Sequence, residues 1–106
     1  MTDFQKLDEA GFKSLIASSK KPVLVEFGAP WCKPCKFLEP ELLKLGQEQN
    51  GRLLLAMIDV DQCPDLLMGL NIMGVPTVIL FVGGKEVQRT TGFLSLDKLK
   101  SRFQLS

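Results

Sequence analysis

The stretch "APWCKPCKFLEP", residues 29–40, decides both the fold and the chemistry expected of this chain. It holds two of the three cysteines, spaced as Cys-x-x-Cys, and it follows the apolar run "PVLVEFGA" at 22–29. That run predicts a buried strand, and apolar residues then recur at helical intervals from Phe37 to Leu45. The cysteine pair is therefore expected where a strand ends and a helix begins.

At such a junction the first sulfur meets unpaired backbone N–H groups and the positive end of the helix dipole. Both favour the thiolate, the reactive form, so Cys32 is expected to be the nucleophile. Cys35, one turn further along, can attack a mixed disulfide on Cys32 and release the second product as a thiol. Pro34 stiffens the turn and has no N–H to offer, so its neighbours must supply the donors.

The residues before and after this stretch alternate between helix and strand. Residues 8–18 predict an amphipathic helix capped by Asp8. The helix that begins near Cys32 should kink at Pro40 and end at Asn50–Gly51. The run "RLLLAMIDVD" at 52–61 predicts a strand covered on both faces, which is typical of a parallel sheet, with a short helix after it.

The last third of the chain predicts a hairpin and a helix. Residues 76–92 contain two strand-like runs on either side of Gly83–Gly84, as in an antiparallel hairpin. Ser95 should cap the final helix, whose apolar stripe is Leu96, Leu99 and Phe103. The order of elements predicts an α/β fold with helices on both faces of a sheet.

Composition and length limit the possible partners. The chain has 106 residues, and we expect a single domain spanning 1–106. Lys plus Arg number 13 against 12 Asp plus Glu, so the net charge of +1 gives no basic field for nucleic acid or anionic membranes. With no histidine and only one Cys-x-x-Cys, a zinc site is disfavoured, although a cluster shared between two chains stays open.

The opening residues, "MTDFQKLDEAGFKSLIASSKK", contain no apolar run of signal-peptide length, and no segment is long enough to span a membrane. We therefore expect a soluble cytoplasmic protein. In that reducing compartment a close cysteine pair is more often catalytic or metal-binding than a permanent staple.

The segments "EFGAPWCKPCKFLEP" at 26–40, "GVPTVILF" at 74–81 and "GGKEV" at 83–87 together resemble the thioredoxin family, over essentially the whole chain. The resemblance implies a thioredoxin fold, with a central mixed sheet of about five strands between helices. It also implies a monomeric protein disulfide reductase that uses no cofactor. Its substrates would be disulfide-containing proteins, and a thioredoxin reductase would recharge it.

The same resemblance assigns roles to individual residues. It makes Cys32 the attacking sulfur, Cys35 the resolving sulfur, and Val75–Pro76 a cis peptide that faces the pair. Val75 would offer its backbone to an extended substrate segment. The shallow apolar groove around the pair would be lined by Trp31, Gly74, Val75, Pro76 and Gly92.

Glu26 lies within the apolar run "VLVEF", at the position where the family usually has a buried aspartate. A buried carboxylate is costly unless it is protonated, so its pKa should be raised. Such a group suits a base that takes the proton of Cys35. The alternative is that Glu26 lies at a strand edge and only reaches solvent.

Three residues depart from the family pattern. Lys33 replaces the usual glycine between the cysteines, Gly28 replaces a frequent aromatic residue, and Met57 stands where a lysine often neighbours the acid. The ammonium of Lys33 should favour the Cys32 thiolate and make the pair slightly more oxidising, so Lys33 and Pro34 are expected to tune its pKa. Lys36 is expected to be ordinary solvated helix surface.

The remaining candidates have simpler interpretations. Cys63 is expected to be a free thiol, with a redox switch or a disulfide-linked dimer as the alternative. Met68 and Met73 are expected to fill the core or the groove, and Trp31 should form a partly exposed wall of the site.

The alternative function is a binding module that uses the groove around Trp31 and Pro76 without redox turnover.

Overall fold

A five-stranded mixed sheet with strand order β1-β3-β2-β4-β5 lies at the centre of the computed structural model, which describes residues 4–105. The elements along the chain are β1 (Phe4–Leu7), α1 (Glu9–Ser18), β2 (Val23–Gly28), α2 (Lys33–Gln49), β3 (Leu54–Asp59), the 3₁₀ helix η1 (Val60–Gln62), α3 (Pro64–Gly69), β4 (Thr77–Val82), β5 (Lys85–Thr91) and α4 (Leu96–Phe103). The expected α/β fold is confirmed.

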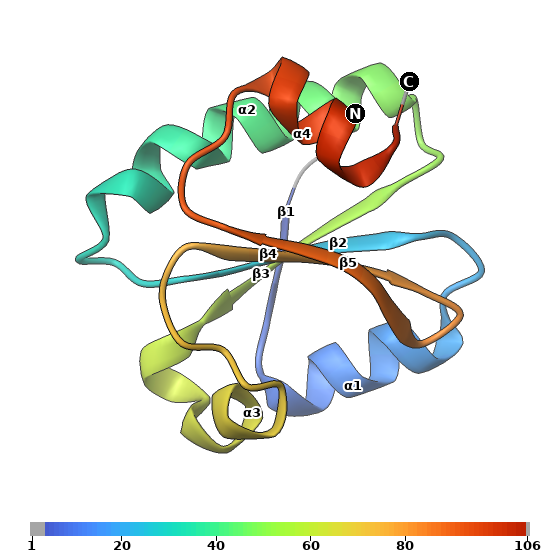
Figure 1. The fold of residues 1–106 in the computed structure, drawn as a ribbon. Helices are drawn as coiled ribbons and strands as arrows, with labels where there is room; N and C mark the ends of the chain where they lie inside the picture. The colour runs from blue at the N-terminus through green and yellow to red at the C-terminus, as the bar shows by residue number, and fades with distance from the viewer. Residues whose placement is uncertain (1–3, 106) are drawn as a thin grey trace.

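The helices cover both faces of this sheet (Figure 1): α2 and α4 lie on one side, and α1 and α3 lie on the other. β3 runs parallel to β1 and to β2, whereas β4 is antiparallel to its neighbours β2 and β5. β2 is the middle strand, and all six of its residues are buried. A side chain in β2 therefore lies in one of the two cores and cannot reach solvent at a sheet edge.

Local sequence signals place the ends of several elements. Asp8 caps α1, with its carboxylate accepting the N–H of Gly11 at 2.7 Å. Asn50 ends α2 in the left-handed conformation, with φ of 51°. The β4–β5 turn uses two glycines with positive φ, Gly83 and Gly84, as the hairpin prediction requires.

Three large apolar side chains lie at the surface and not in the core. Phe37 is 65% exposed, because the buried stripe of α2 runs through Cys35, Leu38, Leu42 and Leu45 and Phe37 lies beside that stripe. Met68 on α3 and Met73 in the following loop are 80% and 89% exposed, so the core is wrong as a place for either side chain, and a place in the groove stays a prediction. The residue pattern also gave no sign of β1, which has four residues and buries none of them fully.

Candidate active site

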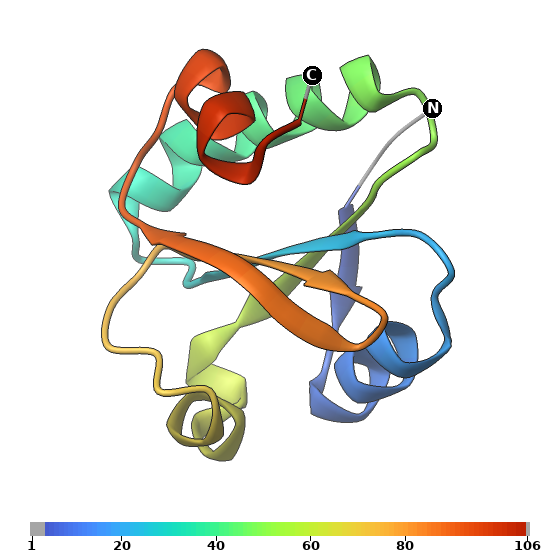
Figure 2. The ribbon, with the colours of Figure 1, turned by 45° about the vertical axis from the view of Figure 1, so that its right-hand side comes forward.

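Three loops meet at one end of the sheet. β2 and β5 run antiparallel to β4, so the C-terminal ends of β2 and β5 lie beside the N-terminal end of β4. The loop after β2 leads to Cys32, the loop before β4 holds Val75 and Pro76, and Gly92 follows β5. Figure 2 shows these strand ends together on the side where α2 begins. The fold therefore brings the predicted site residues to one place.

The cysteine pair occupies the N-terminus of α2. Cys32 and Cys35 form a disulfide bond with a Cα–Cα distance of 5.3 Å. Cys32 is the N-cap, and its sulfur accepts the backbone N–H of Cys35 at 3.2 Å. Cys35 is fully buried while Cys32 keeps 4% of its surface, so an incoming disulfide reaches Cys32 first. The helix N-terminus supplies a donor where a Cys32 thiolate would carry its charge.

The loop next to the pair is held in shape by short hydrogen bonds. The Val75–Pro76 peptide bond is cis. The Thr77 hydroxyl donates to the Gly74 carbonyl at 2.6 Å, and the Gly92 N–H donates to the Pro76 carbonyl at 2.8 Å. Within residues 4–105 no hydrogen bond engages the backbone of Val75. Its N–H and C=O are therefore available to an extended segment of another protein.

Trp31 forms an exposed wall beside the disulfide. The residue is 67% exposed, and its Nε1–H donates to Asp61 Oδ2 at 2.8 Å. The N–H of Asp61 in turn donates to Asp59 Oδ1 at 3.0 Å, which ties the indole to the end of β3. The sequence reading missed Asp61, because nothing in the local pattern predicts this contact across 30 residues of chain.

Glu26 lies in β2, the middle strand of the sheet. It is only 1% exposed, in a strand with neighbours on both sides, so the strand-edge alternative is wrong. Neither of its carboxyl oxygens has a hydrogen-bond partner in the described part of the chain. Burial first, and then the negative charge of Glu39, raise the pKa of Glu26 to about 8, against a smaller opposing effect of Lys36.

Gly28 separates the acid from the inner sulfur. A Cβ atom built on Gly28 would lie 3.1 Å from Cys35 Sγ and 3.4 Å from Glu26 Oε2. The sulfur and the carboxyl group therefore both border the small space beside Gly28. A proton can pass between them through one water molecule in that space.

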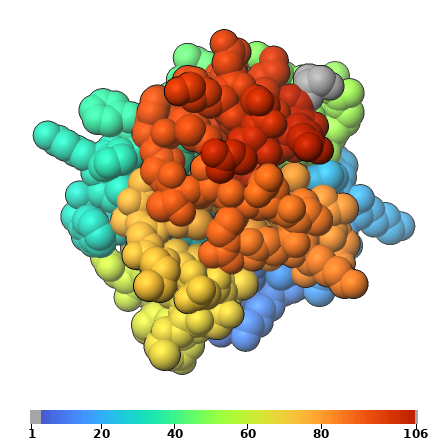
Figure 3. Space-filling model, in the orientation of Figure 1, coloured from blue at the N-terminus to red at the C-terminus, as the bar shows by residue number. Residues whose placement is uncertain are grey.

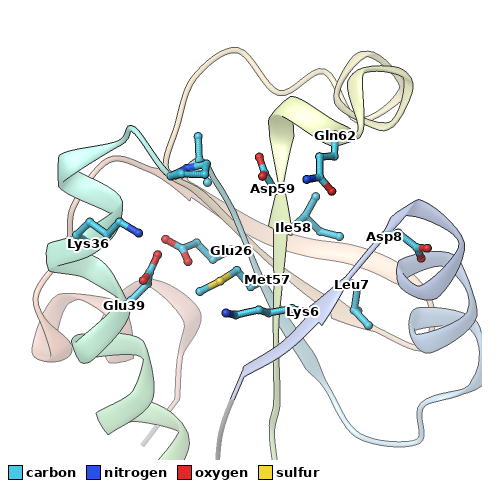
Figure 4. Close-up of a pocket in the computed structure, with 13 residues that line it drawn as sticks. Lys6, Leu7, Asp8, Glu26, Lys36, Glu39, Met57, Ile58, Asp59 and Gln62 are labelled. Atoms are coloured by element: carbon cyan, nitrogen blue, oxygen red, sulfur yellow. The ribbon is translucent and has the colours of Figure 1, made fainter.

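A pocket of about 510 Å³ opens from Glu26 toward the surface between β1, α2 and β3. Figure 4 shows the Lys36 ammonium and the Glu39 carboxyl turned toward Glu26, with Met57 below them. Lys36 was expected to be ordinary solvated helix surface; it is exposed, and it also lines this pocket. The sequence reading missed Glu39, although its position four residues after Cys35 places it on the same helix face.

Lys33 and Pro34 are exposed on the first turn of α2.

Arg89 in β5 fixes the start of the loop that ends at Pro76. Its guanidinium donates to the Leu70 carbonyl at 2.9 Å and to the Asn71 carbonyl at 3.4 Å. A second set of bonds, including one of 2.6 Å, joins it to Glu86. Figure 3 shows the segment after α3, in yellow, packed against β5, in orange. The sequence carries no local signal for this contact.

Cys63 is a buried free cysteine at the start of α3. Burial, reinforced by the charges of Glu9 and Asp8, raises the pKa of its thiol. A thiol that resists ionisation reacts slowly, so the structure gives no support to a redox switch at Cys63.

Among residues 4–105 no three or more His, Cys, Asp or Glu side chains are placed to hold a metal ion. None of the helices in this range has the length and apolar character to cross a bilayer.

A disulfide-forming pair at a helix N-terminus, on a five-stranded mixed sheet, defines a thiol–disulfide oxidoreductase. The thioredoxin family model matches residues 3–104. The chain belongs to the thioredoxin family.

Individual relatives agree with this assignment. The chain is 38% identical over 86 residues to Thioredoxin 1 of Chlorobaculum tepidum, a match that covers 81% of this chain and 85% of that protein. It is 41% identical over 87 residues to a bifunctional thioredoxin reductase/thioredoxin of Mycobacterium leprae, covering 82% of this chain but 19% of that longer protein. The crystal structure of chloroplastic thioredoxin z is similar with a TM-score of 0.85 at 33% identity, covering 99% of this chain and 96% of the other.

Proposed function

We propose that the protein is a thioredoxin-like protein disulfide reductase, an electron carrier that serves cell redox balance through Cys32 and Cys35. The observation that carries this proposal is their disulfide at the N-terminus of α2, where the Cys35 N–H meets Cys32 Sγ. The two sulfurs store the two electrons, so the proposed reaction needs no cofactor.

The first step takes place on the exposed side of the pair. In the reduced protein the Cys32 thiolate attacks one sulfur of a substrate disulfide and forms a mixed disulfide. The substrate S–S bond breaks, and its other sulfur leaves as a thiolate. The donor N–H groups of α2 favour the Cys32 thiolate, and we assign Lys33 and Pro34 to tuning its pKa. The substrate would lie in the groove, where the backbone of Val75 would pair with an extended substrate segment. The residues that line the groove are Trp31, Gly74, Val75, Pro76 and Gly92.

The second step takes place on the buried side. Glu26 accepts the proton of Cys35, and Cys35 attacks Cys32 Sγ. The bond between Cys32 and the substrate breaks, and the second substrate sulfur leaves with its electron pair. The protein ends with the Cys32–Cys35 disulfide that the structure contains. A thioredoxin reductase would then return two electrons. The M. leprae relative, by its name a bifunctional thioredoxin reductase/thioredoxin, supports such a donor.

The test is reduction of insulin disulfides by the protein recharged with a dithiol. Turnover is expected for wild type, and Cys32→Ser should abolish it together with the mixed disulfide. If Cys32→Ser retained activity, the assigned nucleophile would be wrong. If the wild type lacked activity while the protein still bound partners through the groove, a binding module would be the better description of its function than a reductase. The pair of cysteines, both present and joined, favours the reductase.

A cytoplasmic location, a monomeric state and the lack of nucleic-acid or membrane partners stay predictions. The near balance of acidic and basic residues supports the last of these. Gel filtration of the purified protein and fractionation of cells that produce it would test the first two.

A further inference from the structure

Glu39 is an acid near the site that the mechanism above does not use. It lies on α2 one turn after Cys35, half-buried, and lines the same pocket as Glu26 and Lys36. Figure 4 shows its carboxyl group turned toward that of Glu26. Two carboxyl groups that face each other in a partly buried site cannot both ionise easily, so one proton tends to stay between them.

The surroundings of Glu26 leave Glu39 as its principal polar neighbour. Met57 and Val78, which pair with Glu26 across β3 and β4, carry no charge. The charged residues that line the pocket, element by element, are Lys6 from β1, Asp8 before α1, Lys36 and Glu39 from α2, and Asp59 at the end of β3. Of these, Glu39 and Lys36 act on Glu26 and do so in opposite directions.

We propose that Glu26 and Glu39 form a carboxyl pair that holds one proton between them, and that Glu39 is the positioning residue that sets when Glu26 can accept the proton of Cys35. The proposal rests on the proposed function, because it concerns the resolving step of disulfide reduction. It gives the pocket a role, since the pocket connects the pair to the exposed surface near Lys6 and Lys36.

The resolving step balances as follows. The S–H bond of Cys35 breaks, its proton passes to the Glu26 carboxylate, and the electron pair left on Cys35 Sγ forms the bond with Cys32 Sγ. The S–S bond between Cys32 and the substrate breaks at the same time, and the substrate sulfur leaves as a thiolate with that electron pair. The proton is then shared with Glu39, and from there it leaves to water at the mouth of the pocket. A negative Glu39 holds the proton on the pair, whereas Lys36 favours its release.

The pair can be tested directly by nuclear magnetic resonance titration of the oxidised protein, with glutamate labelled at its carboxyl carbon. The wild type should show a Glu26 transition near pH 8. Glu39→Gln should move that transition down by about one pH unit or more, because it removes the facing negative charge. Lys36→Gln should move it up. Glu48→Gln is the matched control, because Glu48 lies on α2 but pairs with Lys100.

An activity measurement separates positioning from a merely structural role. In Glu39→Gln the low-pH limb of insulin reduction should shift to lower pH by the same amount as the Glu26 transition, and it should not shift in Glu48→Gln. A Glu26 transition that stays at its wild-type pH in Glu39→Gln overturns the pair. Lack of wild-type activity would instead overturn the proposed function, and the titration would still decide on the pair. If Glu39→Gln did not fold, Glu39→Ala would decide by the same measurement, since a Glu26 transition that stays at its wild-type pH there also contradicts the proposal.

Discussion

The exposed side and the buried side of the cysteine pair are built by different means. On the exposed side, around Cys32, the Thr77 hydroxyl and the Gly92 N–H donate neutral hydrogen bonds to the carbonyls of Gly74 and Pro76 and hold the loop in one shape. On the buried side, behind Cys35, charged groups surround a carboxyl that has no hydrogen-bond partner within residues 4–105. Under the proposed function, the exposed side would set which disulfides are bound, and the buried side would set how the proton of Cys35 moves.

The sharpest way to separate the two sides is Cys35→Ser. The exposed side would still form the mixed disulfide through Cys32, but the resolving sulfur would be missing. We expect insulin turnover to fall on the order of 10³-fold or more. The mixed disulfide should accumulate, which mass spectrometry of the acid-quenched reaction can measure. Continued insulin turnover without the covalent complex would contradict the separate roles given to Cys32 and Cys35.

Glu26→Gln tests how much free energy the buried acid costs. The folded protein keeps the Glu26 proton up to a pKa of about 8, whereas the unfolded chain loses it near 4.5. The folded state therefore binds more protons in this window. The contribution of Glu26 to stability is greatest below about pH 4.5, and it is lost as pH rises through about 8, a change of roughly 3–5 kcal/mol.

Urea unfolding of the oxidised protein at several pH values in this window measures that fall. In Glu26→Gln the fall should largely disappear. Glu41 and Glu86 do not contribute to this fall in stability. Their hydrogen bonds to Leu96 and Arg89 lower their pKa values, so their effect on stability occurs at more acid pH. Parallel pH curves for the two proteins would show that Glu26 is not the group responsible.

Gly28→Ala tests the gap between acid and sulfur. The added methyl group would lie 3.1 Å from Cys35 Sγ, so the buried sulfur or the strand must shift. We expect a loss of about 1 kcal/mol in the free energy of unfolding and a slower resolving step. Gly69→Ala in α3 is the control, because its Cβ would meet no atom within 4 Å. Equal stability of the two variants in thermal unfolding would mean that the gap tolerates a methyl group.

The smallest expected effect belongs to the exposed side. Lys33→Gly should raise the pKa of Cys32 slightly and lower the reduction potential of the pair by at most about 20 mV. Equilibration with glutathione measures the potential, and the pH dependence of alkylation measures the pKa. Lys33→Arg keeps the charge and should match wild type. A shift of either quantity in the opposite direction would exclude Lys33 from thiolate stabilisation.

The parts of the fold that could be predicted are those whose signal is local. The apolar runs of β2, β3 and β4 are long enough to show burial on both faces, and Asp8, Asn50 and Gly83–Gly84 have the properties that their caps and turn need. β1 could not be predicted in this way, because its four residues form a strand only by pairing with β3. The cis bond before Pro76 came from the family resemblance, since about 5% of such bonds are cis.

In the candidate site, too, only the features with a local sequence signal could be predicted. The cysteine spacing predicts the helix N-terminus, and burial of the "VLVEF" run predicts a raised pKa for Glu26. The positions of Lys36 and Glu39 depend instead on how α2 is rotated against β2. Helical spacing from Cys35 marks Glu39 as a candidate, but no local pattern says that this face of α2 meets Glu26. The contacts of Asp61 and Arg89 likewise join segments distant in sequence.

The placement of Trp31 gives the protein a built-in optical probe. The chain contains one tryptophan and no tyrosine, so nearly all of its ultraviolet fluorescence comes from one ring at the edge of the disulfide. Disulfides quench a neighbouring indole, and the Asp61 contact holds this indole in a defined orientation. Each redox cycle can therefore be followed in real time by emission intensity, without any attached dye.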